Sequence, residues 1–266
     1  MASLITVLFF VAGLVVGSFL NVVILRGEKG EGFGGRSRCR HCKKVLGIAE
    51  LIPVMSFILQ RGRCRGCHRP FSAQYPLVEI GAALAFAAIA WFFLYSSPSL
   101  SGGRAAVSAQ DLLGLGVALL AASASIVVLV SDLRFQIIPD GAVVILAGAG
   151  VITSLTRDSL LADLVVAAGA ALFFFALWIV SRGRWMGLGD AKLIFATSLF
   201  VGFPAAIAAV LFAFWLGGAT GAALLLAGRK QWGSRIPFGP FILAGAALAW
   251  GFSDAFFVYT GLSLLF

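Results

Sequence analysis

The chain has 266 residues, of which 61% are apolar and only 12% are charged, and its mean hydropathy is +1.02. Soluble domains keep about a quarter of their residues charged, so this composition excludes an ordinary soluble protein and predicts a membrane protein. The formal net charge of +9 comes from basic residues that lie between apolar segments. That distribution is typical of membrane topology signals and argues against a nucleic-acid partner.

The first apolar segment, residues 4–25, is long enough to span a bilayer, which takes about 20 residues. Arg26 and Lys29 follow it and no positive charge precedes it. A cleavable signal peptide has the reverse pattern, with a basic region before a shorter apolar core. We therefore expect residues 1–25 to be a retained transmembrane helix whose N-terminus lies outside.

The polar segment 26–76 holds all four cysteines. They form two CxxC pairs, Cys39 with Cys42 and Cys64 with Cys67. Four thiolates suit the tetrahedral preference of Zn²⁺, so the spacing predicts a structural zinc site in a small cytoplasmic loop domain. Two redox pairs or four unconnected thiols are the alternatives. His41 and His68 are less favoured as competing ligands.

Seven further apolar segments follow and are expected to cross the membrane: 77–95, 112–131, 138–155, 160–180, 191–203, 204–227 and 239–266. Gly202 and Pro204 mark the expected break between segments 191–203 and 204–227. The alternative is that residues 191–227 form one broken element, which would give the chain seven spans in total.

Lysine and arginine counts support eight spans, because cytoplasmic loops collect basic residues. With the N-terminus outside, the inner segments carry eighteen and the outer loops two, Arg104 and Arg157. The fold class is therefore an all-α polytopic membrane protein with about eight transmembrane helices. It has three expected parts: the first helix (1–25), the zinc-binding loop domain (26–76) and a transmembrane bundle (77–266).

Acidic residues near membrane spans are candidates for function, because charge is costly there. Four lie near the predicted spans: Asp132, Asp140, Asp190 and Asp254. Asp132 ends the third span and Asp190 begins the sixth, so the predicted topology places both at the same cytoplasmic edge. Gly187 and Gly189 precede Asp190 and would let an extended peptide approach the backbone closely.

Two neighbouring carboxylates cannot both ionise easily, so one keeps a proton. The ionised group can take a proton from water while the protonated group donates to the scissile carbonyl. Asp132 and Asp190 are therefore predicted to be the catalytic pair of an aspartyl peptidase. The alternative is two ordinary ion pairs, Asp132 with Arg134 and Asp190 with Lys192.

A series of motifs in this order resembles the type IV prepilin peptidase family, whose members are GxGD-class intramembrane aspartyl proteases and N-methyltransferases. The motifs are 17–26 (GSFLNVVILR), the CxxC pairs, 52–56 (IPVMS), 61–64 (RGRC), 75–79 (YPLVE), Asp132 with 138–140 (IPD), 187–192 (GLGDAK) and 236–241 (IPFGPF). The resemblance implies that Asp132 and Asp190 are catalytic. It also matches the four cysteines to the family's zinc-type loop, which is associated with methylation.

The family cleaves a short basic leader from prepilins and pseudopilins at the cytoplasmic face of the bacterial inner membrane. It then methylates the new N-terminal residue with S-adenosylmethionine, and the resemblance implies both activities here. Three positions depart from the family pattern: Ile48 replaces a usual Trp, His68 a frequent Gly, and Arg134 a frequent acid. The methyl-donor site rests on the resemblance alone, because no Gly-rich nucleotide fingerprint is present.

Three other functions remain open. The first is a peptidase without methylation. The second is a transporter that uses the aspartates as an ion or proton relay, although relay acids lie at mid-bilayer and these lie at one edge. The third is a membrane-anchored zinc module that binds a partner, which would leave the aspartates unexplained.

Overall fold

A computed structural model describes residues 2–28, 30–32, 34–96, 108–229, 231, 234 and 236–260. Within these ranges the chain is helical and has no β-strand, only two isolated bridges in the cysteine loop. It forms two compact units, Met1–Val130 and Ser131–Phe266.

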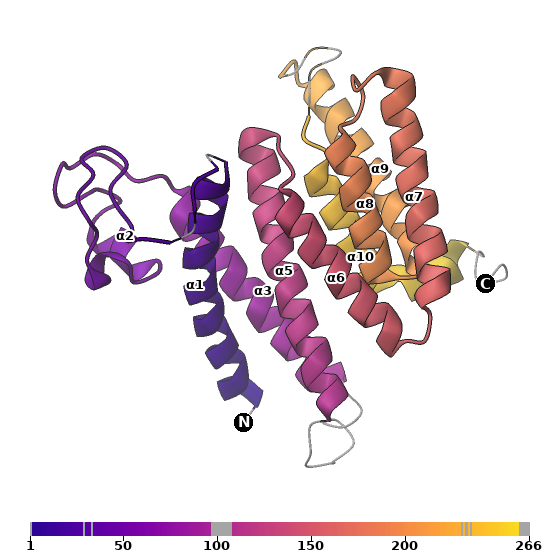
Figure 1. Cartoon of the computed structure of the whole chain (residues 1–266), viewed down its shortest axis with the longest axis horizontal. Helices are drawn as coiled ribbons and strands as arrows, with labels where there is room; N and C mark the ends of the chain where they lie inside the picture. The colour runs from indigo at the N-terminus through magenta and orange to yellow at the C-terminus, as the bar shows by residue number, and fades with distance from the viewer. Residues whose placement is uncertain are drawn as a thin grey trace. The chain divides into compact units, whose positions relative to one another are not determined.

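Eight long helices occur in the order expected from the sequence (Figure 1). They are α1 (Ala2–Gly27), α3 (Gln74–Ser96), α5 (Ala109–Phe135), α6 (Asp140–Thr156), α7 (Leu160–Ser181), α8 (Leu188–Val201), α9 (Ala205–Leu226) and α10 (Gly239–Thr260). Two short helices, η1 (Ile48–Glu50) and α2 (Met55–Leu59), lie in the cysteine loop. Residues 261–266 of the last expected span lie outside the described residues.

Among the described helices, α1, α3, α5, α7 and α9 are long and apolar enough to cross a membrane. The chain is therefore a polytopic membrane protein, while the count of eight spans stays a prediction. Helix α8 has 14 residues and is about 21 Å long at 1.5 Å per residue, short of a hydrocarbon core of about 30 Å. Helices α8 and α9 are separate and meet at residues 202–204, where Gly and Pro predicted the break.

In the first unit, α1 and α3 lie side by side (Figure 1). Two glycines of α1 allow this close approach. A Cβ atom on Gly13 would lie 2.6 Å from the Cα of Ala83, and one on Gly17 would lie 2.7 Å from the Cα of Glu79. Small residues at such contacts are characteristic of helices that pack within a membrane.

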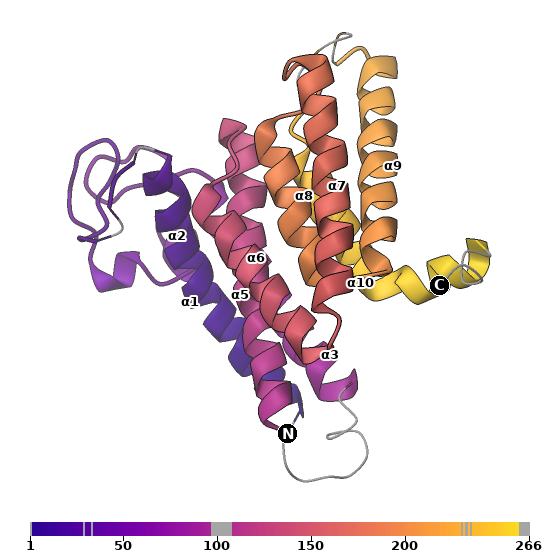
Figure 2. The same cartoon turned by 45° about the vertical axis from the view of Figure 1, so that its right-hand side comes forward.

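In the second unit, α8 lies among α6, α7, α9 and α10 (Figures 1 and 2). Its side chains Leu193, Ile194 and Leu199 are almost fully buried. A Cβ atom on Gly150 of α6 would lie 2.8 Å from the backbone nitrogen of Phe200, so the two helices touch through their backbones. The surrounding helices therefore fix α8, and with it the position of its first turn.

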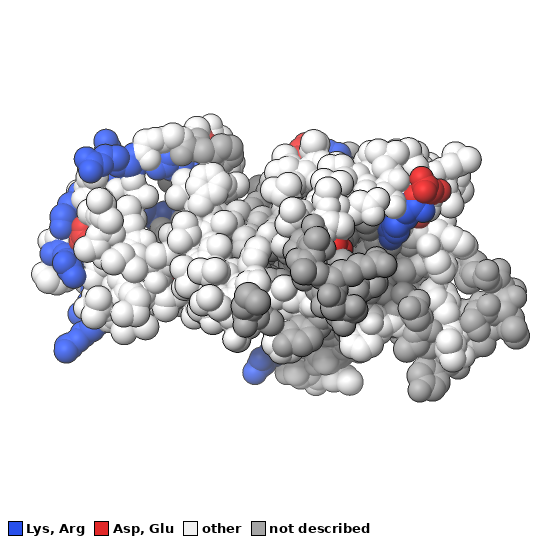
Figure 3. All heavy atoms as spheres, turned by 90° about the horizontal axis from the view of Figure 1, so that it is seen from below, with Lys and Arg blue, Asp and Glu red and all other residues white. Residues whose placement is uncertain are grey.

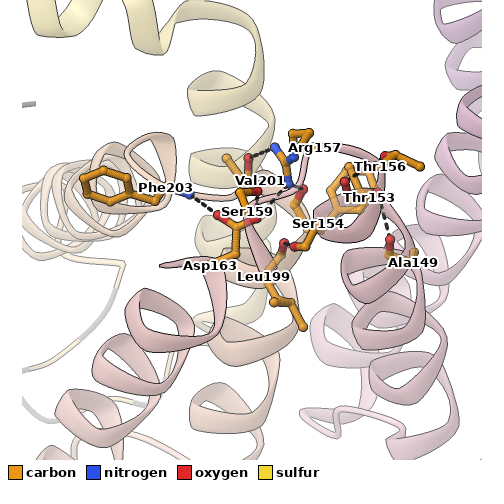
Figure 4. Close-up of polar contacts among 11 residues, drawn as sticks. Ala149, Thr153, Ser154, Thr156, Arg157, Ser159, Asp163, Leu199, Val201 and Phe203 are labelled. Carbon is orange, nitrogen blue, oxygen red and sulfur yellow. Dashed lines mark hydrogen bonds and ion pairs between the residues drawn. The ribbon is translucent and has the colours of Figure 1, made fainter. Parts of the chain in front are cut away.

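The C-terminal end of α8 is held by a polar network (Figure 4). Arg157 donates a hydrogen bond to the carbonyl of Val201 at 2.7 Å and forms an ion pair of 3.5 Å with Asp163. Asp163 is buried and also accepts hydrogen bonds from the N–H of Phe203 (2.8 Å) and the hydroxyl of Ser159 (2.7 Å). The network binds carbonyl groups that a helix end leaves without partners.

Candidate active site and metal centre

Asp132 lies in the last turn of α5, at the start of the second unit. Its side chain is buried, with 5% exposure for the residue, and its Oδ2 accepts a hydrogen bond of 2.9 Å from the N–H of Gly239. Gly239 is the first residue of α10. A Cβ atom there would lie 2.7 Å from Oδ2 of Asp132, so a side chain at position 239 would displace the carboxylate.

Asp190 lies in the first turn of α8 and is also buried, at 8% exposure. Its Oδ2 accepts a hydrogen bond of 2.9 Å from the N–H of Gly187, the residue before the helix. A carboxylate at this place binds an N–H group that the helix start leaves without a partner and interacts favourably with the helix dipole. The predicted glycine turn therefore contacts the predicted catalytic acid directly.

Two contacts bring the chain after Asp132 against the chain around Asp190. A Cβ atom on Gly189 would lie 3.2 Å from the side chain of Ile138, so the glycine allows close packing there. The ammonium group of Lys192 lies 2.9 Å from Oδ1 of Asp140. Lys192 therefore forms its ion pair with Asp140, and not with Asp190 as the alternative in the sequence analysis had it.

These contacts bring the segment after Asp132 beside the first turn of α8, which carries Asp190. Both groups are buried and each accepts one backbone N–H. Two neighbouring buried acids favour a shared proton, because ionising both would place two like charges together out of water. Such a pair can activate water and protonate a carbonyl without a metal or a covalent intermediate.

The four cysteines gather in the first unit, with all four sulfur atoms within 4.8 Å of one another. The Sγ atoms of Cys39 and Cys67 are 3.8 Å apart, and those of Cys42 and Cys64 are 3.9 Å apart. Sulfur atoms bound at 2.3 Å to one tetrahedral Zn²⁺ lie about 3.8 Å from each other. The four side chains therefore fit a single metal ion.

The two CxxC turns have the same backbone pattern. In the first, the N–H of Lys43 binds the carbonyl of Cys39, and in the second the N–H of His68 binds that of Cys64. Lys43 and His68 both have positive φ, at 60° and 56°. That conformation favours glycine, and in this chain a lysine and a histidine adopt it. Among the described residues, the group that could hold a metal consists of the four cysteines without a histidine.

The cysteine thiols shift one another's pKa values. Burial raises the pKa of Cys39, but the N–H groups of Cys42 and His41 and the neighbouring thiols lower it to about 7. The N–H of Lys44 lowers the pKa of Cys42, but desolvation and the neighbouring thiols raise it to about 11. A thiolate at one position thus opposes ionisation at the next, and a divalent cation would remove this repulsion.

Sequence reasoning missed two residues of functional interest, Gly239 and Asp163. Gly239 belongs to the motif 236–241, which was noted without a role, and it is 107 positions from Asp132. Asp163 was absent from the candidate acids although it is almost fully buried. The side chain of Asp254, a weaker candidate, lies outside the described residues.

Comparison with known proteins identifies two matching family models. Residues 11–93 match the Bacterial Peptidase A24 N-terminal domain, and residues 119–222 match the Type IV leader peptidase family. No solved structure matches the chain.

Several curated proteins are similar over most of their length. A prepilin leader peptidase/N-methyltransferase of Burkholderia pseudomallei (strain 1026b) is 36% identical, across 94% of this chain and 86% of the relative. The protein of that name in Bacillus subtilis (strain 168) is 33% identical, across 93% and 94%. One in Stutzerimonas stutzeri is 32% identical, across 91% and 89%. The chain is a bacterial membrane protein that belongs to the type IV leader peptidase family.

Proposed function

We propose that this chain cleaves the leader peptide from type IV prepilins or pseudopilins and then methylates the new N-terminal residue. The observation that supports the proposal is that two acids of a family member, Asp132 and Asp190, are buried at the ends of segments that pack against each other. The relatives named prepilin leader peptidase/N-methyltransferase support both halves of the activity.

In the proposed cleavage step, one carboxylate of the Asp132–Asp190 pair takes a proton from water as the water attacks the scissile carbonyl. The other carboxyl group donates its proton to the carbonyl oxygen, which gives a neutral tetrahedral intermediate. Proton transfer to the leaving amine then breaks the C–N bond. The N–H groups of Gly239 and Gly187 hold the two carboxylates in place during these transfers.

Gly187 is exposed and leaves the backbone accessible beside Asp190, while Gly189 accommodates the side chain of Ile138. We propose that the prepilin chain lies extended against this turn with its scissile bond between the two acids. The charge pattern favours an N-terminus outside and an active site that faces the cytoplasm of a bacterial inner membrane. An edge position would let the substrate helix stay in the bilayer while its basic leader stays in water.

We propose that Cys39, Cys42, Cys64 and Cys67 hold one structural Zn²⁺. A site closed by four thiolates has no free position for a substrate, so the metal would fold the loop and not take part in chemistry. The methyl group would come from S-adenosylmethionine, which is proposed from the family alone.

A mass-based assay tests both activities on the full chain. The purified protein in lipid nanodiscs is incubated with a prepilin peptide, with and without S-adenosylmethionine. We expect loss of the leader in both samples and the added mass of one methyl group only with the methyl donor. Cleavage without methylation would leave a peptidase alone, and an uncleaved peptide would contradict the proposal.

A further inference from the structure

The short helix α2 presents an apolar face outward. Met55, Ile58 and Leu59 are 53%, 61% and 67% exposed, and their i, i+3, i+4 spacing places them on one side of the helix. Phe57 points the other way, because its ring lies 3.0 Å from a Cβ atom built on Gly62. A helix in a water-soluble loop would bury the aliphatic face, so this one is arranged for an apolar environment.

The segment that carries α2 is anchored beside the spanning helices and not beyond their ends. The N–H of Val54 donates a hydrogen bond of 2.7 Å to the carboxylate of Glu79. Glu79 is five residues after the first residue of α3, about 7.5 Å along the axis. It packs on Gly17, which is ten residues before the end of α1, about 15 Å.

Figures 1 and 2 both show the cysteine loop with α2 alongside the last part of α1. The distance of about 7.5 Å from the start of α3 falls within the depth of about 5–10 Å at which amphipathic helices lie at the boundary between headgroups and acyl chains.

The backbone at the anchor is unusual. Val54 has a φ of 60°, which is rare for a β-branched residue and requires support from its surroundings. The support is the carboxylate of Glu79, which is itself buried at 6% exposure. Two motifs without an assigned role, 52–56 (IPVMS) and 75–79 (YPLVE), supply the two partners of this bond.

The loop that contains α2 is rich in exposed basic side chains. Arg61 and Arg63 follow α2 directly and are exposed. Seven more exposed cations lie elsewhere in the loop: Arg36, Arg38, Arg40, Lys43, Lys44, Arg65 and Arg69. Figure 3 shows blue side chains gathered over this part of the first unit. Each basic residue near an anionic membrane surface contributes about 1 kcal/mol to its attraction.

We infer that residues 51–59 are an interfacial segment inserted in the bilayer that the chain itself spans. The outward face of α2 lies among the acyl chains, and Arg61 and Arg63 reach the phospholipid headgroups. Lipid is the occupant because α1 also has exposed apolar side chains near the anchor at Gly17, where Val15 and Phe19 are 60% and 54% exposed. This proposal concerns the loop alone and does not depend on the proposed enzymatic function.

Hydrophobic photolabelling of the full chain tests the inference. The protein is placed at one copy per nanodisc, in discs that contain anionic phospholipid, without substrate. It is then labelled with a carbene reagent that partitions into acyl chains and mapped by peptide mass spectrometry. We expect label at residues 55–59 and in α1, where Leu4, Val7 and Leu8 are exposed, and no label at residues 36–47.

The substitution Glu79→Ala removes the anchor and leaves the apolar face unchanged. It should reduce label at residues 55–59 severalfold while label in α1 stays constant, which shows that the protein still spans the disc. Absence of label at 55–59 in the unsubstituted protein, with α1 labelled, would overturn the inference. Loss of that label when a prepilin peptide is added would also overturn it, because the face would then belong to the substrate.

Discussion

At the scale of single residues, each acid of the candidate dyad accepts an N–H from a glycine. The acids themselves could be predicted, because a carboxylate at a span edge is rare and stands out in an apolar sequence. Gly239 could not be predicted, because it binds Asp132 through its backbone across 107 positions. A backbone donor leaves no signal in a side-chain pattern.

The substitution Gly239→Ala should reduce cleavage roughly 10- to 100-fold through kcat, with little change in KM. The added methyl group would lie 2.7 Å from Oδ2 of Asp132, so the carboxylate must turn away from its catalytic position. Steady-state cleavage of a prepilin peptide measures both constants. Gly251→Ala in the same helix is the matched control, because a Cβ atom there meets open space. An unchanged kcat for Gly239→Ala would show that Gly239 does not position the carboxylate of Asp132 for catalysis.

The dyad itself predicts that Asp132→Asn and Asp190→Asn each lower cleavage by about 10³-fold or more, because an amide can neither take nor share the proton. Asp140→Asn is the control: this acid forms an exposed ion pair with Lys192, which contributes at most about 1 kcal/mol. Membrane insertion and thermal unfolding of each variant show whether the fold is kept. Near-normal cleavage by either dyad variant would disprove the assignment.

At the scale of elements, α8 carries Asp190 at its first turn and is held at its other end by the Arg157–Asp163 network. The break after α8 was predictable from Gly202 and Pro204. The network was not, because Arg157 counted only as a topology charge. Nothing in the sequence distinguishes Asp163 from an ordinary polar residue at a helix start. Burial distinguishes these residues, and a sequence does not display burial for a single acid.

Asp163→Ala should lower the free energy of unfolding by about 3 kcal/mol, because it removes the carboxylate that accepts the N–H of Phe203 and pairs with the guanidinium of Arg157. Thermal unfolding in a fixed detergent measures the change. Asp158→Asn, at a neighbouring exposed position, should leave the unfolding midpoint where it is. Equal midpoints for the two variants would mean that the network does not hold the end of α8.

At the scale of the whole molecule, the cysteine cluster and the aspartate pair belong to different compact units. The cluster was predictable because the CxxC spacing brings the two cysteines of each pair together through local backbone structure. The packing of the helices was not, because spans that are apolar on all sides give no contrast between a buried face and a lipid-facing one. The order of helices followed from the sequence, whereas the contacts around α8 required the structure.

This separation predicts that Cys39→Ser or Cys64→Ser releases the metal and abolishes methylation while cleavage suffers less. Structural zinc contributes on the order of 10 kcal/mol to folding, so the loop loosens without it. Asp132 and Asp190 keep their contacts, which lie wholly within the second unit. Metal analysis should find about one zinc per chain before substitution, and mass spectrometry follows both activities in each variant.

The control is Ser37→Ala, which lies near the first CxxC pair but outside the cluster and should retain metal and methylation. Equal loss of cleavage and methylation would show that the loop also serves the peptidase, and a folded protein without bound metal would disprove the zinc assignment.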